Sequence, residues 1–212
     1  MIVHFEAFLL AITILTLTPG LDTALVIRNT SRSGVAAGSV TSLGICMGLF
    51  VHATFSAIGI SAVLMQSAEL FQIVKGVGAL YLIWLGLSSL KAMFKGNASI
   101  ELTQSKIQNT SIKRSLREGF LSNILNPKTA VFYLAFLPQF IDPNGSPLMQ
   151  SLLMALIHFV IAMIWQCGLA AMIDSAKALL KGGGFMRKME GVTGVVLVAL
   201  GIKLLLEEPP QA

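Results

Sequence analysis

The chain has 212 residues, of which 55% are hydrophobic and only 12% are charged, and its mean hydropathy is +0.79. Soluble domains carry about 25% charged residues, so this chain has too few polar side chains to coat a soluble globule of its size. Its net charge of +5 comes from basic residues placed between apolar runs, which predicts a lipid bilayer as the partner and no nucleic acid.

Apolar runs long enough to cross a bilayer predict an all-α, polytopic membrane helix bundle with about six transmembrane helices. In chain order the predicted spans cover residues 3–28, 36–64, 70–93, 119–141, 148–173 and 191–206. The whole chain, 1–212, is predicted to be a single transmembrane domain. Its first half, about 1–94, is joined to its second half, about 119–212, by a polar cytoplasmic linker at about 95–118.

The basic residues predict the orientation of this bundle. Twelve of the 15 lysines and arginines lie beside the loops between spans 1 and 2, spans 3 and 4, and spans 5 and 6. By the positive-inside rule, the face that carries these basic residues is cytoplasmic. With six spans, both termini are then expected on the outer face.

The first predicted span is interrupted by the sequence "LTPGLDTALV". Pro19 removes a backbone donor and Gly20 loosens the chain, so the helix is expected to break after Thr18. Asp22 follows where a new half-helix would begin. A deep aspartate costs roughly 2.5–3.5 kcal/mol on insertion scales, which favours a binding role for it. The alternative is a proline kink with an N-cap aspartate near the cytoplasmic interface.

The second predicted span has glycines at positions 44 and 48, and His52 continues their stripe. The glycines are interpreted first as a packing feature that lets helices approach closely. His52 therefore points inward, either as a satisfied polar group or as a proton-linked site. His158 in the fifth span, with Gln166 two turns further on, is a weaker candidate.

The fourth predicted span carries a positive charge, opposite to that of Asp22, in the sequence "NPKTAV". Pro127 breaks the helix, Asn126 places an amide at the break, and Lys128 follows directly. Lys128 either extends its ammonium to the cytoplasmic face or turns into the bundle. In the second case it would pair with Asp22 or with a substrate carboxylate.

The two interrupted spans, 1 and 4, occupy corresponding positions in a 3+3 arrangement. Because three is odd, a duplicated three-span unit would enter the membrane in the opposite sense, as inverted repeats of transporters do. Each break has a polar residue, a proline and a Thr-Ala pair before an apolar run, although a match this short can also arise by chance. The second break is expected nearer the start of its span than the first.

The motifs "TPG", "RNTSRSGVAAG", "KGVGALYLIWLG" and "GFLSNILNPKTAVFYLAFLPQF" resemble those of the LysE/RhtB family of amino-acid exporters. The resemblance runs in order along essentially the whole chain. It implies a small, multi-pass protein of the bacterial inner (cytoplasmic) membrane that exports amino acids or close derivatives, coupled to an ion gradient. It directs attention to six positions: Pro19, Gly20, Asp22, Asn126, Pro127 and Lys128.

These observations predict a secondary transporter that exports a small, neutral amino acid by alternating access around spans 1 and 4, with a proton as the coupling ion. Asp22 would hold the substrate ammonium or the proton, and Lys128 would attract the carboxylate. A single deep acid disfavours lysine or arginine as substrate, because a second cation would lack a partner. Predicted substrate or ion contacts are Asp22, Thr18, Pro19, Gly20, Asn126, Pro127, Lys128 and His52.

No enzymatic activity, cofactor or metal is predicted, and two alternatives from other classes remain. One is a membrane thiol-redox carrier that uses Cys46 and Cys167, although neither has a CxxC partner. The other is an intramembrane enzyme built on histidines and Asp22, although the chain lacks HExxH spacing and paired carboxylates. A homodimer stays open, because the glycine stripes could pack within one bundle or between two.

Overall fold

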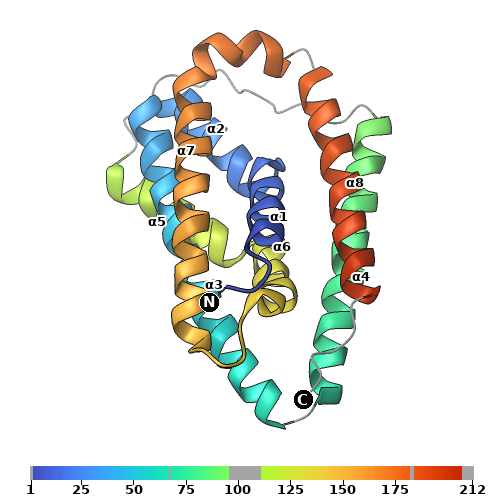
Figure 1. Ribbon diagram of the computed structural model, residues 1–212. Helices are drawn as coiled ribbons and strands as arrows, with labels where there is room; N and C mark the ends of the chain where they lie inside the picture. The colour runs from blue at the N-terminus through green and yellow to red at the C-terminus, as the bar shows by residue number, and fades with distance from the viewer. Residues whose placement is uncertain (1, 67, 96–110, 182–183, 207–212) are drawn as a thin grey trace.

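The computed structural model of the protein is all-helical in the part that it describes, residues 2–66, 68–95, 111–181 and 184–206 (Figure 1). Most of the predicted linker, residues 96–110, lies outside this part. The long elements are α3, α4, α7 and α8, and the shorter ones flank two breaks. In chain order the elements are α1 (Phe5–Leu17), α2 (Leu21–Ser33), α3 (Val35–Gln66), α4 (Ala68–Lys95), α5 (Ile112–Ile124), α6 (Pro127–Val131), the π-helical turn η1 (Phe132–Phe136), the 3₁₀ turn η2 (Leu137–Phe140), α7 (Pro147–Lys181) and α8 (Gly184–Leu206).

Two of the described helices are long and apolar enough to cross a membrane alone, and one bent pair qualifies as a further span. Within the described residues, Val35–Gly59 of α3 and Pro147–Ile173 of α7 each qualify alone, and α1 with α2 qualifies as one span bent by 47°. Shorter apolar helices lie at Gly76–Lys91 in α4 and Gly194–Lys203 in α8. The protein is therefore a polytopic, all-helical membrane protein, as predicted. The count of six spans stays a prediction.

The first predicted interruption is present between α1 and α2. Helix α1 ends at Leu17, because the proline two residues later cannot donate to the helical ladder. The hydroxyl of Thr18 turns back and donates to the carbonyl of Ile14 at 2.7 Å. Gly20 is extended and serves as the N-cap position of α2, which places Asp22 in the first turn.

The second interruption follows a longer helix than the sequence predicted. Helix α5 begins at Ile112, seven residues before the expected start of span 4, so the end of the predicted linker is helical. This stretch is polar in composition and was therefore predicted to be a linker. It nevertheless forms a helix with one buried face, on which Ser115, Gly119 and Asn123 follow one another at intervals of four residues. Both breaks therefore follow a 13-residue helix, and the second lies near the middle of its segment.

The two broken segments run antiparallel to each other through the centre of the bundle. The backbone N–H of Val3, before α1, donates to the carbonyl of Phe140 at the end of η2. Further along, α2 and α5 pack together with their directions opposed, and Arg28 and Glu118 form an ion pair of 2.7 Å between them. Both breaks consequently meet in the interior.

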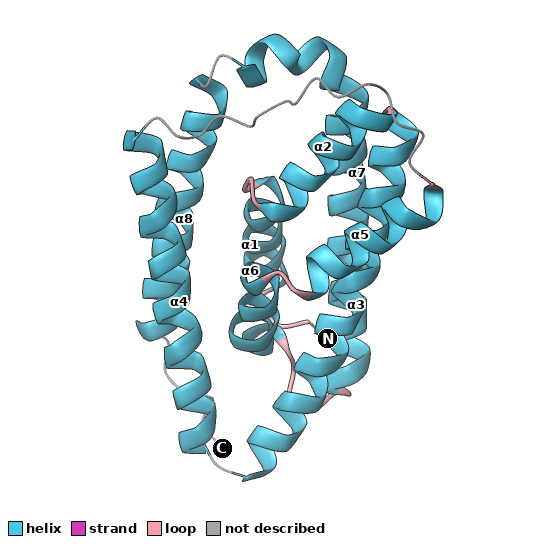
Figure 2. Ribbon diagram, turned by 180° about the vertical axis from the view of Figure 1, so that it is seen from behind, coloured by secondary structure: helices cyan, strands magenta, loops and turns pink. Residues whose placement is uncertain are grey.

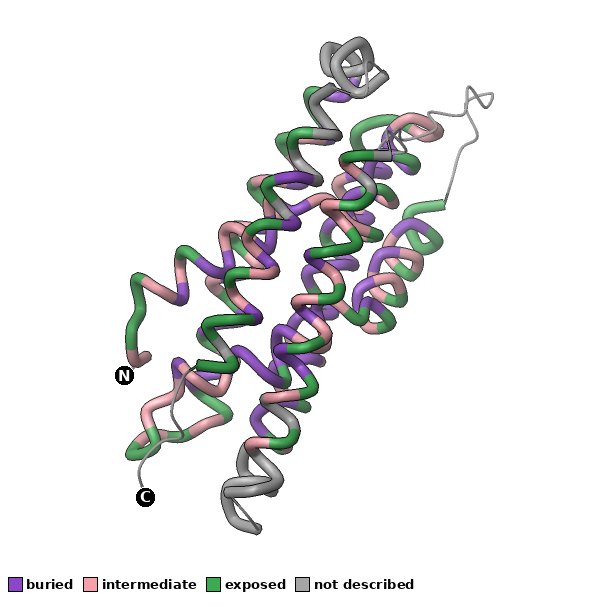
Figure 3. Tube along the Cα trace, turned by 90° about the vertical axis from the view of Figure 1, so that its right-hand side faces the viewer, coloured by how far each residue is buried: buried purple, intermediate pink, exposed green. Residues whose placement is uncertain are grey.

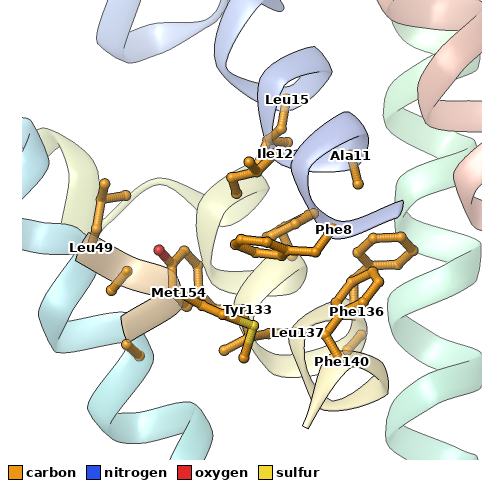
Figure 4. Packing of buried hydrophobic residues seen from close by; sticks show 14 of the residues in the cluster. Phe8, Ala11, Ile12, Leu15, Leu49, Tyr133, Phe136, Leu137, Phe140 and Met154 are labelled. Atoms are coloured by element: carbon orange, nitrogen blue, oxygen red, sulfur yellow. The ribbon is translucent and has the colours of Figure 1, made fainter. Parts of the chain in front are cut away.

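The long helices flank the apolar helices α1 and α6 from two sides, whereas α2 and α5 pack against α3. Helix α3 packs against α5 and α7, while α4 pairs with α8, and α1 and α6 lie between the two groups (Figures 1 and 2). A core of aromatic side chains joins α1 to the second segment, with Phe8 and Phe140 in edge contact at 5.5 Å between ring centroids (Figure 4). Exposed and buried residues alternate along the helices (Figure 3), and the exposed ones include Phe55, Trp84 and Ile164, which suit a lipid-facing surface.

Helices α3 and α5 cross so closely that only glycine fits at the contact. A side chain at Gly44 would collide with the carbonyl oxygen of Leu116, and one at Gly119 would collide with that of Thr41. The glycine stripe read from the sequence is therefore a packing feature between helices of one chain. It brings the end of α5 within reach of the first break.

We expect Gly119→Val to destabilise the bundle, because the added methyls would push α5 away from α3. Overpacking of this kind costs about 1–3 kcal/mol, and the melting temperature of the detergent-purified protein should fall by several degrees. The matched control is Gly168→Val on α7, where no atom lies within 4 Å of the position that a Cβ would occupy. Equal melting temperatures for the two variants would contradict the close crossing.

Candidate functional site

The carboxylate of Asp22 is held by side chains from the other half of the chain. It accepts hydrogen bonds from Ser122 Oγ at 2.7 Å, Asn123 Nδ2 at 2.9 Å and Asn126 Nδ2 at 3.0 Å. All three donors lie at the end of α5 or in the second break. The acid also lies in the first turn of α2, where the helix dipole favours negative charge. The carboxylate is thus stabilised by the dipole of its own helix and by hydrogen-bond donors from the second half of the chain.

The ammonium of Lys128 is directed inward to the first break. Its Nζ donates to the carbonyl of Leu15 at 3.3 Å and to that of Thr18 at 3.1 Å. In a continuous helix the carbonyl of Leu15 would accept from the N–H of residue 19, which proline lacks. Lys128 supplies that missing donor. Gly20 leaves room for it, since a Cβ there would lie 3.3 Å from the ammonium nitrogen.

Asn126 joins the two charged residues. Its Oδ1 accepts the backbone N–H of Lys128 at 3.1 Å and so caps α6, while its Nδ2 donates to Asp22. The sequences after the two breaks, Asp-Thr-Ala at 22–24 and Lys-Thr-Ala at 128–130, therefore occupy equivalent positions in opposed half-helices. Polar groups at each break therefore bind the other break: Asn126 donates to Asp22, and Lys128 donates to the carbonyls at the end of α1.

A small cavity lies between the breaks. Its volume is about 30 Å³, which is room for about two water molecules and for no amino acid. Threonine hydroxyls line it from both segments, at positions 16, 18, 23 and 129, together with Asp22 and Lys128. In this conformation the space between the polar groups is too small for a ligand of amino-acid size, which would require the half-helices to move apart.

The structure brings most of the predicted site residues to this cavity. Thr18, Gly20, Asp22, Asn126 and Lys128 all line it. The two prolines, at positions 19 and 127, form the breaks without lining the cavity.

His52 lies behind the cavity and not on its wall. Its Nε2 is 2.9 Å from the backbone carbonyl oxygen of Asn123, and because a carbonyl only accepts, this nitrogen carries the hydrogen. The histidine thereby holds the end of α5, from which Asn123 donates to Asp22. His52 was interpreted either as a satisfied polar group or as a proton-linked site, and this geometry matches the satisfied polar group.

Sequence reasoning missed two of the three donors to Asp22. Ser122 and Asn123 precede the second break, and with Asn126 they share a helical spacing of three and four residues that could have marked a polar face. Asn123 is 1% exposed, and its Oδ1 rests against Gly48 of α3, where a Cβ would lie only 2.6 Å away. A glycine at position 48 thus makes space for the amide that binds Asp22.

Helix α7 forms the opposite wall of the cavity with His158, Ala162 and Gln166. The ring of His158 stacks on Tyr133 with 6.0 Å between centroids, and its Nδ1 is hydrogen-bonded to the tyrosine hydroxyl at 3.0 Å. Tyr133 has no exposed surface, so this pair is enclosed. His158, which the sequence offered as a weaker candidate than His52, lines the cavity, whereas His52 does not.

The two cysteines lie on different helices. Cys46 is buried in α3 and Cys167 is partly buried in α7, and both are free thiols. Within the described residues, no three histidine, cysteine or acidic side chains are grouped so that they could hold a metal ion.

Opposed broken helices that bring an acid and a lysine into a small polar cavity of a membrane bundle are typical of membrane transporters. Residues 13–208 match the LysE type translocator family, and the chain belongs to this family. The family resemblance read from the motifs is confirmed, and so is the prediction that the protein is not an enzyme, because the family consists of translocators.

The relatives match between about two thirds and nine tenths of the chain. It is 39% identical to the uncharacterized membrane protein YrhP of Bacillus subtilis, over 89% of this chain and 92% of that protein. It is 32% identical to the homoserine/homoserine lactone efflux protein of Salmonella typhimurium, over 93% and 94% respectively. It is 30% identical to the leucine efflux protein of an Enterobacter species, over 68% and 67%. No solved structure matches the chain.

Proposed function

We propose that the protein is a secondary transporter that exports a small, neutral amino acid or a close derivative across the bacterial inner membrane. The observation that carries this proposal is the placement of Asp22 and Lys128 on opposed half-helices around one cavity. An amino acid carries the complementary pair of charges. The efflux proteins among the relatives, named for homoserine and leucine, support both the direction and the substrate class.

In the proposed binding mode the substrate ammonium lies against Asp22 and the substrate carboxylate against Lys128. Each group would replace part of a contact that the closed site makes internally, the amide donors at the acid and the α1 carbonyls at the lysine. Binding would then loosen the contacts that hold the breaks together. That exchange links occupancy of the site to movement of one half against the other.

The proposed bundle has six spans in a 3+3 inverted arrangement, with its basic face in the cytoplasm. The order of the broken helices supports the inversion. In the first segment an apolar helix, α1, precedes a polar one, α2, and in the second the polar α5 precedes the apolar α6–η2. Alternating access would proceed by rocking of these segments about the breaks.

We propose a proton as the coupling ion, with Asp22 as its carrier when substrate is absent. The support is that Asp22 is the carboxylate lining the cavity and is held there by hydrogen-bond donors from three residues of the other broken segment. Protonation would cancel its charge and weaken the contacts with the α5 amides. The half-helices would then part without leaving an uncompensated carboxylate at Asp22.

The substrate proposal predicts efflux of homoserine and leucine, and no acceleration of lysine. Cells with and without the protein are loaded with dipeptides of each amino acid, and the appearance of the free amino acid outside is followed. Neutral side chains fit because the cavity offers one carboxylate and already contains the cation of Lys128. Faster efflux of lysine alone would contradict the proposal.

A further inference from the structure

One face of α7 closes the cavity opposite the two breaks. His158, Ala162 and Gln166 follow one another at intervals of four residues, so their side chains lie in one row. The side chain in the middle is a single methyl, flanked on either side by a polar group. The apolar remainder of this region is supplied by Leu15, Ile45 and Leu49.

Gln166 has an unused hydrogen-bonding group at this wall. Its side chain is 6% exposed, and its buried Oε1 has no hydrogen-bond partner within the described part of the chain. A buried amide without a partner is costly and uncommon in folded proteins. Such a group is expected to gain its partner from a ligand.

Several other polar side chains of the cavity already have partners or are turned away from it. The hydroxyls of Thr16 and Thr18 donate to helix carbonyls, and Asn126 uses both ends of its amide. The Oδ1 of Asn123 also lacks a partner among the described residues, but it rests against Gly48 of α3. Gln166 is therefore the group on the α7 wall with an oxygen left to accept a hydrogen.

We propose that Gln166 and Ala162 form the subsite for the substrate side chain, in which the amide of Gln166 binds a side-chain hydroxyl and Ala162 sets the space available. This inference rests on the proposed function. With the ammonium at Asp22 and the carboxylate at Lys128, the third substituent of the α-carbon extends to the α7 wall. A short side chain that ends in a hydroxyl, as in homoserine, satisfies Gln166, whereas an apolar side chain of equal length leaves it unsatisfied.

The test compares homoserine with norvaline, which has a methyl in place of the hydroxyl at nearly equal size. Purified protein is reconstituted in liposomes, and efflux of each labelled amino acid is measured. The wild-type protein should prefer homoserine by at least about tenfold, because a site built around a hydroxyl rejects the analogue without it. Gln166→Leu should remove most of this preference by slowing homoserine while norvaline efflux persists.

Two further variants make the outcome decisive. Gln166→Met keeps the length and flexibility of the side chain and should act as Gln166→Leu does. Gln139→Leu, the same change in η2 away from the cavity, should retain the wild-type preference. Ala162→Val should slow leucine more than homoserine, because it narrows the subsite.

Each outcome bears on one claim. If the wild-type protein moves none of these amino acids, the proposed function fails. If it transports them and both Gln166 variants keep the wild-type preference, the subsite is wrong. The subsite is equally wrong if monodisperse Gln166→Met protein transports neither amino acid, because a group that contacts only the side chain leaves norvaline efflux intact.

Discussion

Asp22→Asn is expected to lower export at least tenfold, which corresponds to about 1.4 kcal/mol. The carboxylate accepts hydrogen bonds from Ser122, Asn123 and Asn126, and an amide would turn its own NH₂ group toward at least one of these donors. It would also remove the negative charge proposed to bind the ammonium or the proton. Efflux of homoserine or leucine from dipeptide-loaded cells measures the effect.

The matched control for this prediction is Glu6→Gln, the same acid-to-amide change at an exposed position of α1 away from the cavity. Its export should equal that of the wild-type protein. Normal export by an Asp22→Asn protein at normal membrane abundance would show that the carboxylate serves only the fold, at the first turn of α2, whose N-cap is Gly20 and not the aspartate. The proposed binding mode would then be withdrawn.

Lys128→Met is expected to abolish export and also to destabilise the protein. The ammonium donates to the carbonyls of Leu15 and Thr18 at the end of α1, and its removal leaves buried acceptors without a donor. Each unsatisfied group costs about 1–3 kcal/mol. Thermal unfolding of the purified protein and efflux from loaded cells measure the two effects separately.

A second substitution separates the structural role of Lys128 from its role in transport. In Lys128→Met with Pro19→Ala, position 19 regains a backbone N–H, and α1 can extend by one residue to satisfy Leu15. Melting temperature should recover in part while export stays lost, because the cation proposed to attract the carboxylate is still absent. Recovery of export in the double variant would show that the lysine serves the fold alone.

Local chemistry made both breaks predictable. Proline lacks an N–H, so the sequences Pro19-Gly20 and Asn126-Pro127 had to interrupt apolar segments wherever they occurred. The membrane class followed from composition for a similar reason, since apolar runs of this length have no soluble alternative. These inferences needed no knowledge of which segments meet in space.

The start of α5 was missed because its signal lies in periodicity and not in composition. The residues before Gly119 are strongly polar, and a polar stretch between apolar ones resembles a loop. Only the burial of small residues at intervals of four, against the glycines of α3, shows that this stretch is a packed helix. For the same reason the second break was expected nearer the start of its helical segment than it is.

The partners of Asp22 and the role of His52 were beyond reach for a different reason. Ser122 is separated from Asp22 by 100 positions in the chain, and the two meet because α2 and α5 pack in opposite directions. His52 shares a stripe with glycines, which indicates that it points inward but not that it binds a backbone carbonyl. Contacts of this kind depend on tertiary packing, which no local pattern encodes.

The unlike charges at two otherwise similar breaks give the proposed site a handedness. Two acids or two lysines would bind an amino acid equally well in either direction, whereas Asp22 and Lys128 fix which end of the substrate faces which half-helix. The α7 wall then supplies a third fixed direction at the α-carbon. Three unlike contacts distinguish an object from its mirror image, so in this arrangement one enantiomer of an amino acid turns its side chain toward Gln166, and the other turns a hydrogen there.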